Sequence, residues 1–197
     1  MQVQRQQQYY SPTEYLELEE KADCRHDYRD GKIVEMTGGS FNHNQISLNL
    51  ALSLRLALRE QNYQICMADM RLWIPRYSQY TYPDVMVIAG EPVFQADRND
   101  TLTNPSIILE VLSKSTSTYD RGDKFTYYRS IPELQDYVLL DHYRFHVEQF
   151  SKTAEGKWLL TDYELENDEL ELTTIALQIP LKEIYERVKF ESPETQS

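Results

Sequence analysis

Two acidic residues interrupt apolar runs that are otherwise typical of buried strands. Asp84 lies in YPDVMVIA and Glu110 lies in SIILEVL. An ionised carboxylate in a low-dielectric interior costs several kcal/mol unless a cation, a metal or hydrogen bonds offset that cost. Side chains alternate between the two faces of a strand, so Glu110 shares its face with Leu112. Two such acids predict a site for a hard cation such as Mg²⁺, which takes oxygen ligands from carboxylates, water and phosphate.

Each acid could instead be structural. It could lie at a strand end, where it is solvated or paired with an arginine, because ion pairs of this kind also perturb acidic groups. Pro83 restricts the backbone before Asp84 and removes one N–H donor at the start of that strand. The presence of two acids, followed by the basic segment YDRGDKFTYYR, favours the metal site over two separate ion pairs.

The elements expected to position these acids are helices alternating with strands. The segment SPTE, residues 11–14, has the form of a capping box and predicts a helix that ends near Ala22. HDYRDGKIVEM predicts two strands joined by a tight turn at Asp30 and Gly31.

The segment from Ile46 to Leu58 has an apolar residue at every second position, the formal signature of a half-buried strand. It is too long for a typical strand, and its residue types favour a helix. We therefore predict a helix whose leucines spread around the cylinder, so most of its sides should be covered. A sheet and a second subunit would provide that cover.

The rest of the chain predicts an α/β domain. Strands are expected over YQICMA, MRLWI, DYVLLD, RFHVEQF and KWLLTDYEL, and helices over TYDRGDKFTYYRSI and PLKEIYERV. We expect one domain over residues 11–190, with a mixed central sheet flanked by helices and an added β-rich C-terminal part. Residues 1–10 and 191–197 are expected to be disordered ends.

Composition predicts a globular protein of the cytoplasm. The chain has 197 residues, 41% of them hydrophobic, and no apolar run approaches the ~20 residues that span a bilayer. Its N-terminus lacks the apolar core of a secretory signal, and Cys24 and Cys66 are expected to be reduced thiols. The net charge of −12 argues against a general nucleic-acid coat protein. From Glu155 onward the chain has 11 acidic and 4 basic residues, so the remainder could still form a neutral or basic cleft.

Several of these segments are similar, as a set, to one known family. PDVMVI, ILEVLSKST, YDRGDKFTYYRS and DYVLLD, with YRDGKIVEMTGGSFNHNQI upstream, resemble the Uma-two family of restriction endonucleases. That family is a branch of the PD-(D/E)XK nuclease superfamily, and the resemblance covers about residues 12–188. It implies that the domain over residues 11–190 has a restriction-endonuclease-like fold, in which a mixed sheet carries the acids near its strand ends. It also implies Mg²⁺-dependent hydrolysis of DNA, with Mn²⁺ as a substitute metal.

The resemblance also implies which residues hold the metal. Asp84 and Glu110 would bind Mg²⁺ together with the main-chain carbonyl of Val111. The superfamily pattern places a lysine two residues after the second acid, and this chain has Leu112 at that position.

Two other lysines could replace the missing one. Lys124, on the following helix, is the expected catalytic lysine, because a long side chain can place its ammonium from another element. Lys114 has the right strand parity but lies about 7 Å beyond Leu112. The structural alternative for Lys124 is a solvated ion pair with Asp120, four residues earlier.

Supporting roles are expected for residues that other chemistry could equally explain. His43 matches a recurrent histidine of the family and could contact phosphate or carry a proton, or simply bind backbone near a helix start. Asp27 stands where the family tends to have glutamate, so it is a candidate third carboxylate. Tyr128 follows Lys124 by one helical turn and could pack beneath it or in the core. Asp69 and Arg71 could pair with each other or with groups near the site.

Three functions remain open on the sequence alone. The first is a Mg²⁺-dependent endonuclease that acts on DNA as a homodimer. The second is an inactive nuclease-like fold that serves as a binding or regulatory module, which the acidic charge and the displaced lysine favour. The third is a metal-dependent hydrolase of a small phosphorylated compound. His142 and His146 have the spacing of a helical zinc site, but RFHVEQF alternates as a strand and argues against it.

Overall fold

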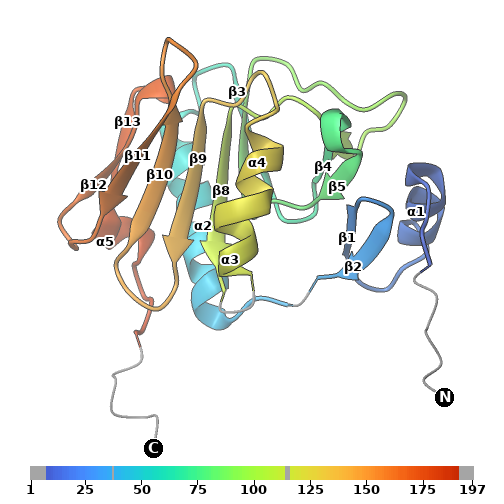
Figure 1. Ribbon diagram of the computed structural model, residues 1–197. Helices are drawn as coiled ribbons and strands as arrows, with labels where there is room; N and C mark the ends of the chain where they lie inside the picture. Colours follow the sequence, from blue (N-terminus) through green and yellow to red (C-terminus); the bar gives the residue numbers. More distant parts are fainter. Residues whose placement is uncertain (1–7, 37, 114–115, 191–197) are drawn as a thin grey trace, which may run out of the picture.

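A six-stranded mixed sheet forms the centre of the molecule (Figure 1), in a computed structural model that describes residues 8–36, 38–113 and 116–190. Its strands are β3 (Tyr63–Met67), β6 (Val85–Ala89), β8 (Ile107–Leu112), β9 (Asp136–Asp141), β10 (Val147–Lys152) and β11 (Trp158–Tyr163). The strand order is β11-β10-β9-β8-β6-β3. Neighbouring strands are antiparallel except β8 and β9, which are parallel.

Two smaller sheets lie beside the central one. The five-stranded sheet has the order β2-β1-β5-β4-β7. It consists of β1 (His26–Arg29), β2 (Lys32–Glu35), β4 (Arg71–Ile74), β5 (Gln79–Thr81) and β7 (Thr101–Leu102). The third sheet is the hairpin of β12 (Glu169–Leu172) and β13 (Leu177–Pro180), which forms the predicted β-rich C-terminal part together with β10 and β11.

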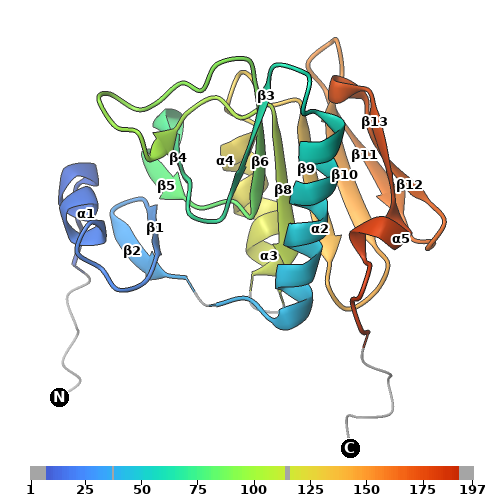
Figure 2. The same cartoon turned by 180° about the vertical axis from the view of Figure 1, so that it is seen from behind.

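Helices cover both faces of the central sheet, as expected (Figures 1 and 2). Helix α2 (Phe41–Ala57) lies on one face, and α3 (Ser117–Tyr119), the π-helical turn η2 (Asp120–Lys124) and α4 (Phe125–Tyr128) lie on the other. The remaining elements are α1 (Pro12–Glu19), α5 (Leu181–Ile184) and the 3-10 turns η1 (Pro75–Tyr77) and η3 (Thr173–Ile175). No helix in the described part of the chain is long and apolar enough to cross a bilayer.

Strand β8 is buried on both faces, which explains its nearly continuous apolar sequence. Ile107, Leu109 and Val111 belong to one core cluster, which also contains residues of α2 and α5. Ile108 and Leu112 belong to the other, which lies under α4. The predicted alternation is confirmed, and Glu110 therefore points toward the α4 side.

The helical prediction for the leucine-rich segment is confirmed, and the sheet covers one of its sides, while the predicted cover by a second subunit stays a prediction. Leu50 and Leu54 are fully buried on the sheet. Leu48, Leu52 and Leu56 are 50%, 55% and 58% exposed, so one face of α2 remains open. Leucine at every second position places residues on opposite sides of a helix, and one sheet can bury only one side.

The local turn predictions differ in their success. The capping box of α1 forms as predicted, and the β1–β2 turn has positive φ at Asp30 and Gly31. The helix expected over residues 118–131 is divided into α3, η2 and α4, and the closing helix is only four residues long. Strands β5 and β7 have three and two residues, and strands this short cannot be recognised from alternating apolar residues.

The predicted disordered ends fall mainly on residues 1–7 and 191–197, which lie outside the described residues. Within the expected N-terminal end, Tyr10 donates its N–H to the carbonyl of Gly31 at 2.8 Å.

The two faces of α2 give a direct test of this packing. Leu50→Ala should destabilise the protein by about 2–5 kcal/mol, because it removes methyl groups from a fully buried site. Leu52→Ala, on the open face, should change the free energy of unfolding of the monomeric chain by less than about 0.5 kcal/mol, measured at a protein concentration too low for association. Urea unfolding followed by circular dichroism measures both. Equal losses for the two variants would show that the buried face of α2 is assigned wrongly.

Candidate active site

A cleft of about 520 Å³ opens where β8 ends, and one side of it is lined by the β1–β2 hairpin. Its lining includes the residues for which the sequence predicts metal binding or catalysis: Asp27, His43, Asp84, Glu110, Val111 and Lys124. Tyr128 belongs to α4, and its side chain lies in the core between this helix and the central sheet. Lys114, the second lysine candidate, lies outside the described residues.

Asp84 is positioned by the end of the ladder between β6 and β8. The last pair of this ladder is Val85 with Leu109, and Pro83, which has no N–H to donate to a ladder, lies just beyond it. The N–H of Val111 instead donates to Asp84 Oδ2 at 2.8 Å. The side chain of Asp84 therefore replaces a missing strand partner, and this bond fixes the carboxylate beside β8.

Glu110 is almost fully buried, at 5% exposure, and its contacts come from the helical side of the sheet. Its Oε1 accepts hydrogen bonds from Lys124 Nζ at 2.7 Å and from the hydroxyl of Tyr128 at 2.8 Å. Burial raises the pKa of Glu110, Lys124 opposes that rise, and the negative charges of Asp84 and Asp120 add to it. An additional cation near Glu110 would stabilise its ionised form.

Lys124 reaches Glu110 from the π-helical turn. Its Nζ also lies 3.3 Å from Asp120 Oδ1, so the ion pair considered as the structural alternative exists together with the contact to Glu110. Burial lowers the pKa of Lys124, but Glu110 and Asp120 outweigh that effect, so the pKa is raised and the side chain is an ammonium. The lysine missing at Leu112 is thus replaced in space by one from a neighbouring element.

His43 lies in the first turn of α2 and approaches the same aspartate. Its Nε2 is 3.1 Å from Asp84 Oδ2, the oxygen that also binds the N–H of Val111. Burial lowers the pKa of His43, and the hydrogen bond and charge of Asp84 reverse that into a net increase. Gly39 makes this position possible, because a Cβ there would come within 2.7 Å of His43 Nδ1.

Asp27 brings a third carboxylate from the hairpin. Its Oδ2 accepts two hydrogen bonds from Arg29, whose guanidinium lies 3.7 Å from the centre of the Tyr119 ring. Its Oδ1 is buried and has no hydrogen-bond partner, which is costly for a carboxylate oxygen beside a cleft. Sequence reasoning missed Arg29 and Tyr119, although Arg29 shares a strand face with Asp27.

The donor set suits a hard divalent cation. Carboxylate oxygens from Asp84 and Glu110 converge on the cleft, and the unpartnered Oδ1 of Asp27 offers an acceptor for a metal-bound water. Carboxylates outnumber lysine and arginine in the cleft lining: five acids, Asp27, Glu35, Asp84, Glu110 and Asp120, against Arg29 and Lys124. A bound divalent cation would reduce this excess of negative charge.

The predicted contribution of Asp69 and Arg71 is wrong. Asp69 forms an exposed pair with Arg25 at 3.7 Å. Arg71 is buried in the five-stranded sheet, where it binds Asp100 at 2.7 Å. Neither of the two lines the cleft, because Arg71 faces the tyrosines of the small sheet instead.

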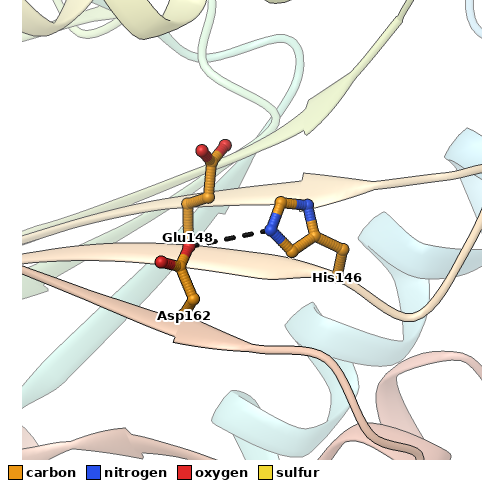
Figure 3. Close-up of side chains that lie close together, drawn as sticks. All are labelled: His146, Glu148 and Asp162. Atoms are coloured by element: carbon orange, nitrogen blue, oxygen red, sulfur yellow. Dashed lines mark ion pairs between the residues drawn. The ribbon is translucent and has the colours of Figure 1, made fainter.

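A second cluster of possible metal ligands lies on β10 and β11, where His146, Glu148 and Asp162 approach one another (Figure 3). Glu148 is bound by Arg121 at 2.6 Å, and Arg144 Nη2 lies 3.4 Å from His146 Nδ1. A guanidinium only donates, so Nδ1 of His146 accepts in this contact, and Nε2 faces Asp162 Oδ1 at 3.6 Å. Two arginines thus already bind members of this cluster, so we interpret it as a polar network between β10 and β11.

The fold and the family comparison place this chain among nuclease-like proteins. Residues 12–182 match the model of the Uma2 family, described as "Putative restriction endonuclease". The chain belongs to this family. It is 44% identical over 160 residues to the uncharacterized protein sll1609 of Synechocystis sp.. The matched region covers 81% of this chain and 90% of that protein. A second protein of that organism, slr1290, is 38% identical over 182 residues, 91% of this chain and 93% of its own length.

A solved structure has the same fold. The crystal structure of "a putative nuclease belonging to DUF820" from Anabaena variabilis superimposes with a TM-score of 0.75. The match covers 89% of this chain and 97% of that one, at 16% sequence identity. The likeness supports the restriction-endonuclease-like α/β fold expected from the sequence.

Removal of Lys124 tests the charge balance of the site. Lys124→Met should destabilise the metal-free protein by about 3–5 kcal/mol, because it leaves Glu110 and Asp120 buried without a cation. The loss should be larger at about pH 8 than at about pH 6, since a carboxyl whose native pKa is raised binds protons in the folded state and becomes less costly as pH falls. Thermal unfolding at both pH values, with the exposed Lys182→Met as control, measures this. A loss that grows toward low pH would contradict the assigned charges.

Proposed function

We propose that this protein is a Mg²⁺-dependent endonuclease that hydrolyses phosphodiester bonds of DNA in the cleft at the end of β8. The observation that carries the proposal is the convergence of Asp84, Glu110 and Lys124, from three elements, on one cleft. The membership of the family supports a nucleic-acid substrate. The two cysteines are free thiols, which supports the cytoplasm as its location.

The metal ligands in this proposal are Asp84, Glu110 and the main-chain carbonyl of Val111, with Mn²⁺ able to replace Mg²⁺. When bound, the metal would polarise the scissile phosphate and lower the pKa of the attacking water. Val111 supports the site through its N–H, which fixes Asp84 Oδ2 and keeps the other oxygen, Oδ1, available to a ligand.

Lys124, His43 and Arg29 would act on the substrate in this proposal. The ammonium of Lys124, 2.7 Å from Glu110, would orient the water and balance negative charge that develops on the phosphate. His43, beside Asp84, would contact phosphate or carry a proton. Arg29 lines the cleft and keeps 29% of its side chain exposed, so it is suited to bind a phosphate of the DNA backbone.

Tyr128 and Asp27 support these groups. The hydroxyl of Tyr128 is a second donor to Glu110 Oε1, so it fixes the orientation of that carboxylate from within the core. Asp27 holds Arg29 against Tyr119, which places its guanidinium at the side of the cleft. Both residues would act through neighbours, in contrast to the groups named above, which would meet the metal or the phosphate.

The active-site assignment predicts the behaviour of three variants. Purified protein should nick plasmid DNA in Mg²⁺ or Mn²⁺, and chelation by EDTA should abolish the activity. Asp84→Ala, Glu110→Ala and Lys124→Met should each lower the rate by about 100-fold or more, because each removes charge stabilisation at the reacting phosphate. Gel assays on supercoiled and on single-stranded DNA measure these rates.

The matched control is Asp123→Asn, an exposed carboxylate on the same π-helical turn as Lys124. It should cleave at the wild-type rate. Cleavage that survives in all three active-site variants would refute the assignment. Metal binding by calorimetry without any cleavage of DNA by the wild type would favour the binding-module function, and hydrolysis of small phosphate esters alone would favour the third function.

The open face of α2 supports a homodimer as part of this proposal. Leu48, Leu52 and Leu56 follow one another at intervals of four residues and form an apolar ridge, and Phe41 at the start of the helix is 71% exposed. Contiguous exposed apolar surface of this kind marks contact sites on soluble proteins. A second copy of the same helix, related by a two-fold axis, would be complementary to it.

A charge on this ridge should separate the subunits. Leu52→Glu should convert a dimer into a monomer, because the interface would bury an unpaired carboxylate. Size-exclusion chromatography with light scattering measures the mass, and circular dichroism verifies that the variant is folded. A wild-type protein that is monomeric at high concentration would refute the dimer.

A further inference from the structure

Lys124 binds two carboxylates, one on β8 and one on its own π-helical turn, and both residues line the cleft. Glu110 is the nearer, at 2.7 Å, and Asp120 lies at 3.3 Å. If Glu110 binds a divalent metal, as the proposed function requires, then two cations share one carboxylate. The attraction of Glu110 for the lysine decreases as its charge is drawn to the metal. The geometry of Lys124 during catalysis then depends on its other partner.

Asp120 is placed to hold the lysine. Its Oδ1 lies 3.3 Å from Nζ of Lys124. Its side chain belongs to the same turn as Lys124, four residues before it, and the residue is 3% exposed. An ion pair of this kind is screened little by solvent.

The backbone around Asp120 is fixed at several points. Its N–H donates to the carbonyl of Thr116 at 2.9 Å, and its own carbonyl accepts the hydroxyl of Tyr137, on β9, at 3.1 Å. The next residue, Arg121, binds Glu148 on β10 at 2.6 Å. These contacts attach the π-helical turn to the central sheet. Such turns frequently occur at functional sites, because they alter the direction of side chains within a helix.

We propose that Asp120 is a positioning residue that holds the ammonium of Lys124 beside Glu110 when Glu110 binds the metal. This inference rests on the proposed function. Asp120 itself contacts neither metal nor phosphate. Its carboxylate neutralises the buried lysine and limits the positions of Nζ, so that the ammonium stays directed at the reacting phosphate. Because Lys124 binds two carboxylates, Asp120 still holds the ammonium when Glu110 binds the metal.

The test separates positioning from metal binding. Asp120→Asn keeps the shape of the side chain and removes its charge. At saturating Mg²⁺ its kcat should fall roughly 10- to 100-fold, the loss expected when a catalytic group is displaced by about 1 Å. The Mg²⁺ concentration that gives half-maximal rate should stay within about twofold of wild type. Asp120→Glu should recover part of the rate, and Asp123→Asn on the same turn should be unchanged.

Two results would overturn the inference. Wild-type kcat in Asp120→Asn would show that Glu110 alone positions Lys124. A normal kcat with a raised requirement for Mg²⁺ would show that Asp120 is a metal ligand.

A readout that needs no activity keeps this inference distinct from the proposed function. Absence of cleavage by the wild type would refute the endonuclease but not the contact, which thermal unfolding of Asp120→Asn, Lys124→Met and the double variant still measures. The melting temperature should fall in Asp120→Asn, and the same substitution should have a much smaller effect in the Lys124→Met background. Additive shifts would show that the two side chains do not depend on each other and would refute the positioning role.

Discussion

The buried contact between Lys124 and Glu110 is the interaction on which the rest of the site depends. Glu110 lies on a strand that is apolar on both faces, so its charge needs a partner from outside the strand. The partner comes from the π-helical turn on the face covered by α3 and α4, which is why this turn must lie close to β8. The acids around the pair exceed the cations, and this excess is what makes a divalent cation the fitting ligand.

Comparison with another buried acid shows why Glu110 is unusual. Asp136, at the start of β9, is 1% exposed and accepts hydrogen bonds from Gln149, Ser151 and Thr174. These neutral donors satisfy it fully and connect β9 to β10 and to the C-terminal part. Glu110 is instead surrounded by other charged groups beside a cleft. Burial alone therefore does not identify a functional acid, and the charge and location of its partners do.

The sequence predicts the architecture well where patterns are local. The capping box at Ser11, the turn at Asp30 and Gly31 and the two-faced strand around Glu110 follow from residue type and alternation. The pairings of the small sheet do not follow, because β5 and β7 are too short for any periodicity. Arg71 illustrates the consequence: its position in the chain places it near the acids, and its strand carries it into another sheet.

The site could be predicted in part for the same reason. Two interrupted apolar runs and the family resemblance predict Asp84, Glu110 and Lys124, and all three line one cleft. The place of Arg29 at the cleft and the positioning role proposed for Asp120 depend on contacts with elements distant in sequence, which no local pattern contains. The exposed leucines of α2 show a further gap: the residue pattern predicts the helix but not which of its sides the rest of the chain covers.

The central claim is that the cleft binds one divalent metal between Asp84 and Glu110, beside Lys124. A crystal of the protein soaked in Mn²⁺, measured for anomalous scattering, tests it most directly. We expect one strong anomalous peak in the cleft, at about 2.0–2.3 Å from an oxygen of each carboxylate and from the carbonyl of Val111. A cleft without a peak, or a peak at His146 and Asp162 instead, would contradict it.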